Sequence, residues 1–325
     1  MQEQLELFTT PFGLAAAVAL GLLWGSFANV CIYRWPPTDA HPRGRSVVRP
    51  GSHCSACGKP IAWYDNVPLL SYLWLRGKCR NCRATFSARY LLVEALTGAL
   101  FGVAWWFTLG TGGMYEALPV RGLWFVVDAA FVFVMVVTTF IDLDHKLILD
   151  KLMIPSAVLF YAATFVLPGY RWWDGLVGIA VGWGLPWLVG EIWFRIKHTE
   201  GLGLGDGMLL AAVGALLGWR GVVVALLGGS LTGAAVTLCS VATPARAAVA
   251  IGAIAAMAVA WVVGGMVAAG VVLCVALLAL LWSLRRSDGG RELLVTEIPF
   301  GPFLAMAALF YLFAAPWIQL HFRLY

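Results

Sequence analysis

Long apolar stretches, separated by short polar connections, dominate this sequence. About 20 apolar residues in an α-helix cross the roughly 30 Å hydrocarbon core of a bilayer, and many of these stretches reach or approach that length. The pattern predicts membrane helices at about 12–33, 90–109, 122–141, 152–167, 173–194, 206–219, 222–241 and 303–318. Of the 325 residues, 61% are hydrophobic and only 12% are charged, which excludes an ordinary soluble domain. We therefore expect an all-α polytopic membrane protein.

The stretch 249–282 is too long for one ordinary membrane helix. Its 34 residues would extend about 51 Å as a single helix at 1.5 Å per residue. A hairpin that turns near Gly264 and Gly265 fits better, because it keeps Arg246 and the arginines that follow residue 282 on one side of the membrane. This hairpin gives about ten membrane helices in total. The alternative is a single tilted or partly re-entrant helix.

The one long polar segment, 34–89, carries a strong excess of positive charge. It holds ten Lys or Arg residues against two aspartates, and loops of this kind remain in the cytoplasm. The chain's first residues lack the basic start and small-residue cleavage site of a secretory signal. We therefore expect the first apolar stretch to remain as a helix. The resulting division is a first transmembrane helix (1–33), a cytoplasmic loop (34–89) and a transmembrane domain (90–325) that includes the extra hairpin at about 249–282.

Four of the seven cysteines form two C-x-x-C pairs within this loop. Cys54 and Cys57 make the first pair, Cys79 and Cys82 make the second, and 21 residues lie between the pairs. Four thiolates at nearly this spacing are typical of a structural zinc site. Zinc binding also supplies folding free energy to a loop that lacks an apolar core. Disulfides or free thiols are the alternative, and a reducing cytoplasm disfavours disulfides.

Two aspartates stand at the ends of apolar stretches. Asp142 ends one stretch, and Asp206 begins another after a glycine-rich segment that includes Gly203 and Gly205. Counting helix directions from the cytoplasmic loop places both carboxylates at cytoplasmic ends. Two close carboxylates share one proton and can act as general base and general acid, while the glycines allow close approach to an extended peptide. Spacing alone leaves open that the aspartates cap helices or pair with basic residues.

Several motifs taken together resemble the type IV prepilin peptidases, membrane aspartyl proteases that process pilins and type II secretion pseudopilins. The matching segments are Gly25-Ser-Phe-Ala-Asn-Val-Cys-Ile-Tyr-Arg-Trp-Pro36, the two cysteine pairs around Trp63-Tyr-Asp-Asn-Val-Pro68, Arg89-Tyr-Leu-Leu-Val-Glu94, Ile141-Asp-Leu-Asp-His145, Glu200-Gly-Leu-Gly-Leu-Gly-Asp206 and Ile298-Pro-Phe-Gly-Pro302. A lone GxGD motif would be weak, but the set in this order is specific. The chain departs from the family pattern at Leu91, usually Pro, at Met208, usually Lys, and in the stretch 249–282.

The resemblance implies that Asp142 and Asp206 are the catalytic aspartates of a GxGD-type membrane protease. It also implies that the cysteine-bearing loop marks the bifunctional branch of the family. Members of that branch use S-adenosylmethionine to N-methylate the newly exposed amino terminus.

Five further residues are candidates for supporting roles. Glu94 is a candidate for holding or deprotonating the new ammonium group, and Asn29 and Arg34 for facing the same cavity. For Glu94, an ion pair with a loop arginine is the alternative. Glu200 and Asp144 are candidates for contacting the substrate, with solvated surface charge as the alternative.

We predict a multi-pass enzyme of the bacterial inner membrane whose active site faces the cytoplasm. It is expected to remove the basic leader of type IV prepilins or pseudopilins and then methylate the new N-terminus, with zinc and S-adenosylmethionine as cofactors. Its partners would be these substrates and the lipid bilayer, without nucleic acid. One alternative is a peptidase without methyltransferase activity. An alternative of another class is a carboxylate-lined transporter with a zinc-ribbon interaction loop, whose carboxylates would be spread across the membrane thickness.

Overall fold

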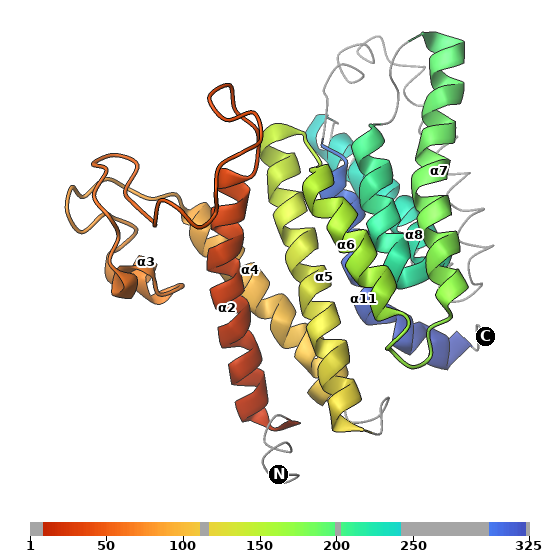
Figure 1. The fold of residues 1–325 in the computed structure, drawn as a ribbon, viewed down its shortest axis with the longest axis horizontal. Helices are drawn as coiled ribbons and strands as arrows, with labels where there is room; N and C mark the ends of the chain where they lie inside the picture. The colour runs from red at the N-terminus through yellow and green to blue at the C-terminus, as the bar shows by residue number, and fades with distance from the viewer. Residues whose placement is uncertain (1–8, 111–116, 199–202, 242–298, 323–325) are drawn as a thin grey trace. The chain divides into compact units, whose positions relative to one another are not determined.

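A computed structural model describes residues 9–110, 117–198, 203–241 and 299–322 (Figure 1). These residues form helices joined by turns, and only isolated β-bridges occur among them. The elements are α2 (Pro11–Arg34), η2 (Trp63–Asn66), α3 (Leu70–Trp74), α4 (Ala88–Trp105), η3 (Trp106–Gly110), α5 (Leu118–His145), α6 (Asp150–Ala163), α7 (Trp172–Lys197), α8 (Leu204–Val241) and α11 (Gly301–Phe322). The chain divides into two compact units, Met1–Val222 and Val223–Tyr325.

Five of the described helices are long and apolar enough to cross a membrane. Within the described residues they confirm the prediction of an all-helical protein with several candidate membrane spans. The count of about ten helices is not confirmed. Helix α6 has only 14 residues, and the stretch 249–282 with its expected hairpin lies outside the described residues.

Helix α8 contains a break near the place where the sequence predicts a turn between two helices. Gly218 has φ 66° and ψ −176°, a conformation that interrupts the helix and that glycine adopts at little steric cost. The predicted turn lies immediately after it, at Trp219 and Arg220. The second compact unit begins shortly afterwards, at Val223.

Helices α2 and α4 approach each other closely through glycines. Each helix carries two glycines four residues apart, Gly21 and Gly25 in α2 and Gly98 and Gly102 in α4. A Cβ atom added to Gly25 would lie only 2.6 Å from the Cα atom of Glu94, and one added to Gly21 would lie 2.8 Å from the Cα atom of Gly98. Small residues at this spacing let membrane helices pack backbone to backbone. This contact brings Glu94 directly against α2.

A second glycine contact joins α7 to the first half of α8. A Cβ atom added to Gly178 would lie 2.2 Å from the carbonyl oxygen of Gly214, and one added to Gly182 would lie 2.4 Å from that of Leu210. Leu209 and Leu210 are fully buried. The close packing fixes the helix that begins with the Gly205–Asp206 sequence.

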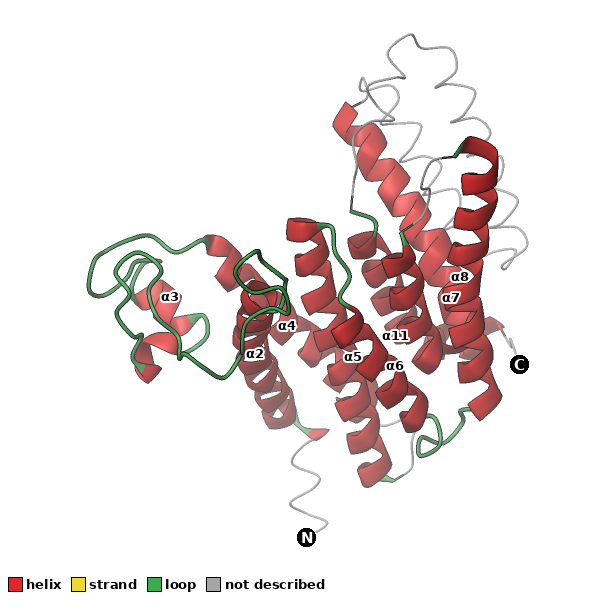
Figure 2. Ribbon diagram, turned by 45° about the horizontal axis from the view of Figure 1, so that its top comes forward, coloured by secondary structure: helices red, strands yellow, loops and turns green. Residues whose placement is uncertain are grey.

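The polar ends of the helices gather at one end of the first unit. Figure 1 shows that α2 and α5 end there and that α4 and α8 begin there. The cysteine-bearing loop leaves α2 at this same end, and Figure 2 shows it with α3 beside α2 and α4. The segments that carry the predicted chemistry therefore lie at a common level.

Candidate functional site

Asp142 lies in the last turn of α5, where the helix is deeply packed. Its side chain is only 5% exposed. The helix ends at Lys146, which has the left-handed angles φ 50° and ψ 44°, and whose N–H donates to the carbonyl oxygen of Asp142 at 2.8 Å. This C-terminal cap fixes the backbone of Asp142.

Asp206 lies in the first turn of α8 and is partly buried. Its N–H donates to the carbonyl oxygen of Gly203 at 3.1 Å. A Cβ atom added to Gly205 would lie 3.0 Å from Cβ of Ile148, so glycine lets the start of α8 pass close to the segment that follows α5. The carboxylates of Asp142 and Asp206 are close enough for their charges to repel each other. The fold therefore brings together the two aspartates that the sequence analysis selected.

Asp144 lies near Asp142 in the chain but is held in a different environment. It forms an ion pair with Arg89, whose Nη2 also donates to the carbonyl oxygen of Phe140 at 3.0 Å. The guanidinium carbon lies 5.0 Å from the centre of the Phe140 ring. Arg89, at the start of α4, thus joins that helix to the last turns of α5. Glu200, the other candidate for substrate contact, lies outside the described residues.

The two cysteine pairs adopt closely similar turns. In the first, the N–H of Cys54 donates to the carbonyl of Lys59 at 2.9 Å, and in the second, the N–H of Cys79 donates to that of Ala84 at 2.8 Å. The residue after each pair has a positive φ, 69° at Gly58 and 59° at Arg83. These turns point the thiols inward, and none of the four is in a disulfide.

The four thiols suit a tetrahedral zinc ion. All four Sγ atoms lie within 4.8 Å of one another, and those of Cys54 and Cys82 are 3.7 Å apart. A Zn–S bond of about 2.3 Å in a tetrahedron requires sulfur atoms about 3.8 Å apart. Hydrogen bonds from the backbone N–H groups of Cys57 and Ala56 lower the pKa of the Cys54 thiol to about 6. The thiolate, which is the form that binds metal, is favoured there.

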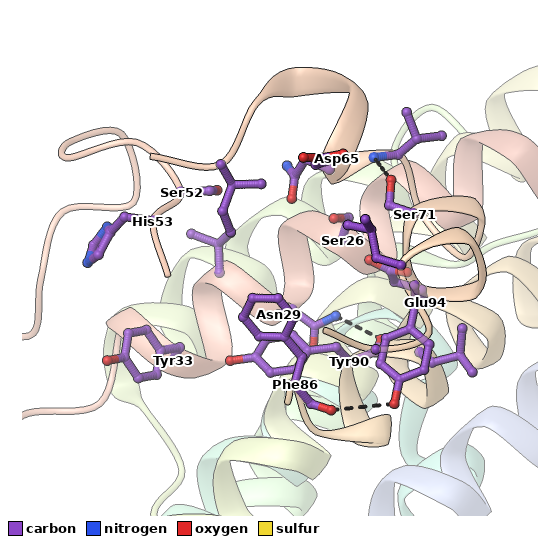
Figure 3. Close-up of a pocket in the computed structure, with 18 of the residues that line it drawn as sticks. Ser26, Asn29, Tyr33, Ser52, His53, Asp65, Ser71, Phe86, Tyr90 and Glu94 are labelled. Carbon is purple, nitrogen blue, oxygen red and sulfur yellow. Dashed lines mark hydrogen bonds between the residues drawn. The ribbon is translucent and has the colours of Figure 1, made fainter. Parts of the chain in front are cut away.

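A pocket of about 210 Å³ lies between the cysteine-bearing loop and helices α2 and α4. Asn29, Arg34 and Glu94, the three residues that the sequence analysis assigned to one cavity, all line it. Arg34 Nη1 donates to the carbonyl of Ser46 at 3.0 Å, which ties the loop to the end of α2. Tyrosines 33, 72 and 90 and Phe86 supply aromatic surface. Figure 3 shows Asn29, Phe86, Tyr90 and Glu94 close together in this pocket.

Glu94 is held in the pocket by the loop above it. Its Oε2 accepts a hydrogen bond from the N–H of Leu69 at 2.9 Å, and the Ser26 side chain also hydrogen-bonds to it. Leu69 itself has the unusual angles φ 57° and ψ −51°. Nearby, Asn29 donates to the carbonyl oxygen of Tyr90 at 3.1 Å (Figure 3). The predicted alternative for Glu94, an ion pair with a loop arginine, is not found among the described ion pairs.

The sequence analysis missed several members of this pocket, Ser26, Tyr33 and Tyr90 among them. Ser26 and Tyr33 recur at intervals of three and four with Asn29 on α2, which places all three on one helical face. Tyr90 and Glu94 have the same relation on α4. This periodicity of polar and aromatic residues within an apolar helix is the signal by which the sequence could have identified them.

Asp128 was also missed, although an aspartate inside an apolar stretch is costly and therefore conspicuous. It is buried in α5, and in the described part of the chain its Oδ1 has no hydrogen-bond partner. It lies far along the helix from Asp142.

Comparison with known proteins gives family matches over most of the chain. The model of the bacterial peptidase A24 N-terminal domain matches residues 19–108, and that of the type IV leader peptidase family matches residues 129–238. No solved structure matches.

Among curated proteins, a prepilin leader peptidase/N-methyltransferase of Myxococcus xanthus is 34% identical over 317 residues, covering 92% of this chain and 90% of the relative. Proteins of the same name from Aeromonas hydrophila and Pseudomonas aeruginosa are 39% and 30% identical, over 66% and 89% of this chain and 76% and 86% of their own lengths. These matches confirm the resemblance found in the sequence, and the chain belongs to the family of type IV prepilin leader peptidases/N-methyltransferases.

Proposed function

We propose that this protein cleaves the leader from prepilins or pseudopilins with Asp142 and Asp206 and then methylates the new N-terminus in the pocket beside Glu94. The observation that carries the first activity is that two helix ends bring two carboxylates close enough to repel each other. The names of the relatives support both activities. The same names do not favour a transporter or a peptidase without methyltransferase activity.

Hydrolysis of a peptide bond follows from a pair of carboxylates that share one proton. Repulsion makes simultaneous ionisation of Asp142 and Asp206 unfavourable. The ionised member accepts a proton from a water molecule as it attacks the scissile carbonyl carbon. The protonated member hydrogen-bonds to the carbonyl oxygen and afterwards supplies the proton that the leaving nitrogen needs. Gly203, where an added Cβ atom would lie 3.5 Å from Oδ2 of Asp206, would leave room for the substrate backbone beside that carboxylate, and Gly205 lets α8 begin close to Ile148.

Methylation requires a neutral amine, so the new N-terminal ammonium group must lose a proton. In this proposal the Glu94 carboxylate, held by Ser26 and the N–H of Leu69, binds the ammonium group and accepts that proton. S-Adenosylmethionine supplies the methyl group when bound. The tyrosines and Phe86 suit its positively charged sulfonium, because aromatic faces attract cations. Asn29 and Arg34 hold the pocket wall.

Zinc has a structural role in this scheme. Cys54, Cys57, Cys79 and Cys82 would hold the ion and thereby order the loop that covers the pocket. The excess of Lys and Arg in this loop favours a cytoplasmic location. Both active sites would then face the cytoplasm from the bacterial inner membrane, with residues 90–325 forming the protease domain. Glu200 and Asp144 remain candidates for contacting the basic leader, Asp144 through its ion pair with Arg89.

The proposed pair of catalytic aspartates, the dyad, is tested by two single variants, Asp142→Asn and Asp206→Asn. Each variant is assayed for cleavage of a purified prepilin. Because each carboxylate has its own part in proton transfer, either variant should lose at least about 100-fold in cleavage rate. Asp150→Asn, in the exposed first turn of α6, is the matched control and should retain activity. Full activity of either dyad variant would overturn the proposed mechanism.

Glu94→Gln tests the second activity with a synthetic peptide that already has the mature N-terminus. The amide keeps the shape and hydrogen-bonding capacity of the side chain but cannot accept the proton. Methyl transfer should fall by about 10- to 100-fold, while prepilin cleavage stays within about threefold. Zinc content, measured by metal analysis, checks that the loop remains folded. Normal methylation by this variant would contradict the assignment of the pocket.

A further inference from the structure

The short helix α3 presents an apolar face to the outside of the loop. Leu70, Leu73 and Trp74 are 66%, 65% and 83% exposed, and their i, i+3, i+4 spacing places them on one side of the helix. The other side is turned inward, since Ser71 and Leu75 line the pocket. Helix α3 is therefore amphipathic, with its large apolar side chains on the exposed side.

Two aromatic residues of η2 extend this exposed apolar surface. Trp63 is 81% exposed and Tyr64 is 53% exposed. Their rings contact each other edge to face with centres 5.7 Å apart. The Ser71 hydroxyl donates to the carbonyl oxygen of Tyr64 at 3.0 Å, which ties η2 to α3. We call the five residues Trp63, Tyr64, Leu70, Leu73 and Trp74 the α3 patch.

The segment of the chain that carries the α3 patch is strongly basic, and the guanidinium carbon of Arg80 lies 5.5 Å from the centre of the Tyr64 ring within the patch. Residues 59–83 contain five basic side chains, Lys59, Arg76, Lys78, Arg80 and Arg83, against the single acidic residue Asp65. Asp65 is already neutralised by Arg80, with N–O distances of 2.5 and 2.7 Å. An acidic protein partner and an anionic lipid surface would both satisfy this charge. Tryptophan, tyrosine and leucine next to Lys and Arg are the composition of segments that lie in the membrane interface.

The position of the α3 patch favours lipid over a protein partner. Helices α2 and α4, between which the loop is inserted, are long and apolar enough to cross a membrane. Their own exposed apolar residues, such as Leu92 of α4 and Leu23 of α2, face outward. Both ribbon views show α3 on the outer side of these two helices, away from α5 (Figures 1 and 2). A bilayer that surrounds α2 and α4 therefore extends toward the α3 patch.

We propose that the α3 patch docks into the headgroup region of the inner leaflet and binds anionic lipid there. Trp63, Trp74 and the leucines insert at the level of the headgroups, and the neighbouring Lys and Arg side chains pair with lipid phosphates. Helix α3 then has lipid on one face and the pocket on the other. The bilayer surface becomes part of the support for the pocket wall. This docking does not depend on which reaction the pocket performs.

Photo-cross-linking in lipid nanodiscs tests this proposal on the full-length, zinc-loaded protein. The photoreactive residue p-benzoylphenylalanine replaces Trp74 in one variant and Leu70 in a second. A third variant carries it at His41, an exposed position in another turn of the same loop. The nanodiscs contain either phosphatidylcholine alone or equal parts of phosphatidylcholine and phosphatidylglycerol. Mass spectrometry identifies the adducts after irradiation, with and without added prepilin.

The expected result is at least about fivefold more lipid adduct at positions 70 and 74 than at position 41, with a further increase when phosphatidylglycerol is present. Equal labelling at the three positions would overturn the proposal. Adducts to prepilin in place of lipid would overturn it in favour of a substrate-docking surface. Yields that do not respond to phosphatidylglycerol would refute binding of anionic lipid. Because both substituted side chains are exposed, unchanged zinc content establishes that each variant is folded.

Discussion

The pocket region and the aspartate region use the same packing device but fix their polar groups differently. In both, two helices meet through glycines, Gly25 against Glu94 in the first and Gly178 against Gly214 in the second. The aspartates stand on the helices themselves, and α5 is largely buried around Asp142. The pocket is completed by a loop in which few apolar side chains are buried, Cys54 and Cys79 among them.

The two sites therefore depend on different physical forces. Buried apolar surface and close helix packing can maintain the aspartate pair without a cofactor. The loop buries too little apolar surface to order itself, so a metal bound by the four cysteines would have to supply the free energy. The two activities should therefore respond separately to metal loss and to changes in helix packing.

The largest expected effect is that loss of the metal reduces methyl transfer far more than cleavage. Cys54→Ser removes one of the four proposed zinc ligands, and the loop would lose the free energy that orders the pocket. We expect zinc content to fall from about one equivalent to none and methyl transfer to fall by at least about 100-fold. Cleavage should stay within about threefold. Cys31→Ser is the control, because Cys31 is buried in α2 and is not one of the four clustered thiols. Parallel loss of both activities would show that the sites are not independent.

Adding a methyl group at a glycine contact should slow one activity and spare the other, and which activity is slowed depends on the contact. In Gly178→Ala the new methyl group would lie 2.2 Å from a backbone oxygen of α8, so α7 and α8 must move apart, at a cost of about 1–3 kcal/mol. Thermal unfolding should occur at lower temperature and cleavage should slow, with zinc content unchanged. Gly25→Ala, which displaces Glu94, should instead slow methylation of the mature peptide.

Gly184→Ala provides a matched control for these substitutions. A Cβ atom at Gly184 would meet nothing within 4 Å, although the residue lies on the same helix as Gly178. Its two activities should match those of the parent protein, and its unfolding temperature should be equal or slightly higher, because alanine favours a helix by about 1 kcal/mol over glycine. If Gly178→Ala behaved like this control, the close contact between α7 and α8 would not be needed to position Asp206.

The smallest expected effect concerns the two cysteine turns. Arg83 has a left-handed backbone at the position where the first turn has Gly58. A non-glycine residue in this conformation costs about 1–2 kcal/mol. Replacing it by glycine removes this cost, but the greater freedom that glycine gives the unfolded chain offsets part of the gain in stability. Arg83→Gly should therefore slow zinc release to a chelator slightly, whereas Gly58→Ala should accelerate it. The same direction of change in both variants would contradict the equivalence of the turns.

The sequence predicted the features that depend on local pattern. Apolar length indicated helices, C-x-x-C spacing indicated a metal site, and the motifs around Asp142 and Asp206 indicated the family. Local pattern was weaker for helix number, because the apolar stretch 152–167 was long enough to predict a membrane helix, whereas α6 has only 14 residues. It was also insufficient for Asp144, since the ion pair with Arg89 joins residues that are distant in the chain.

By itself, the sequence determined the membrane class, the family and the residues able to do chemistry, because length, spacing and residue type carry that information directly. Only the tertiary structure decided which of these residues meet. Ser26, Leu69 and Glu94 come from three separate segments, and glycine contacts between helices determine their distances. Such long-range contacts depend on how helix surfaces fit together, and no periodicity within a single segment encodes that fit.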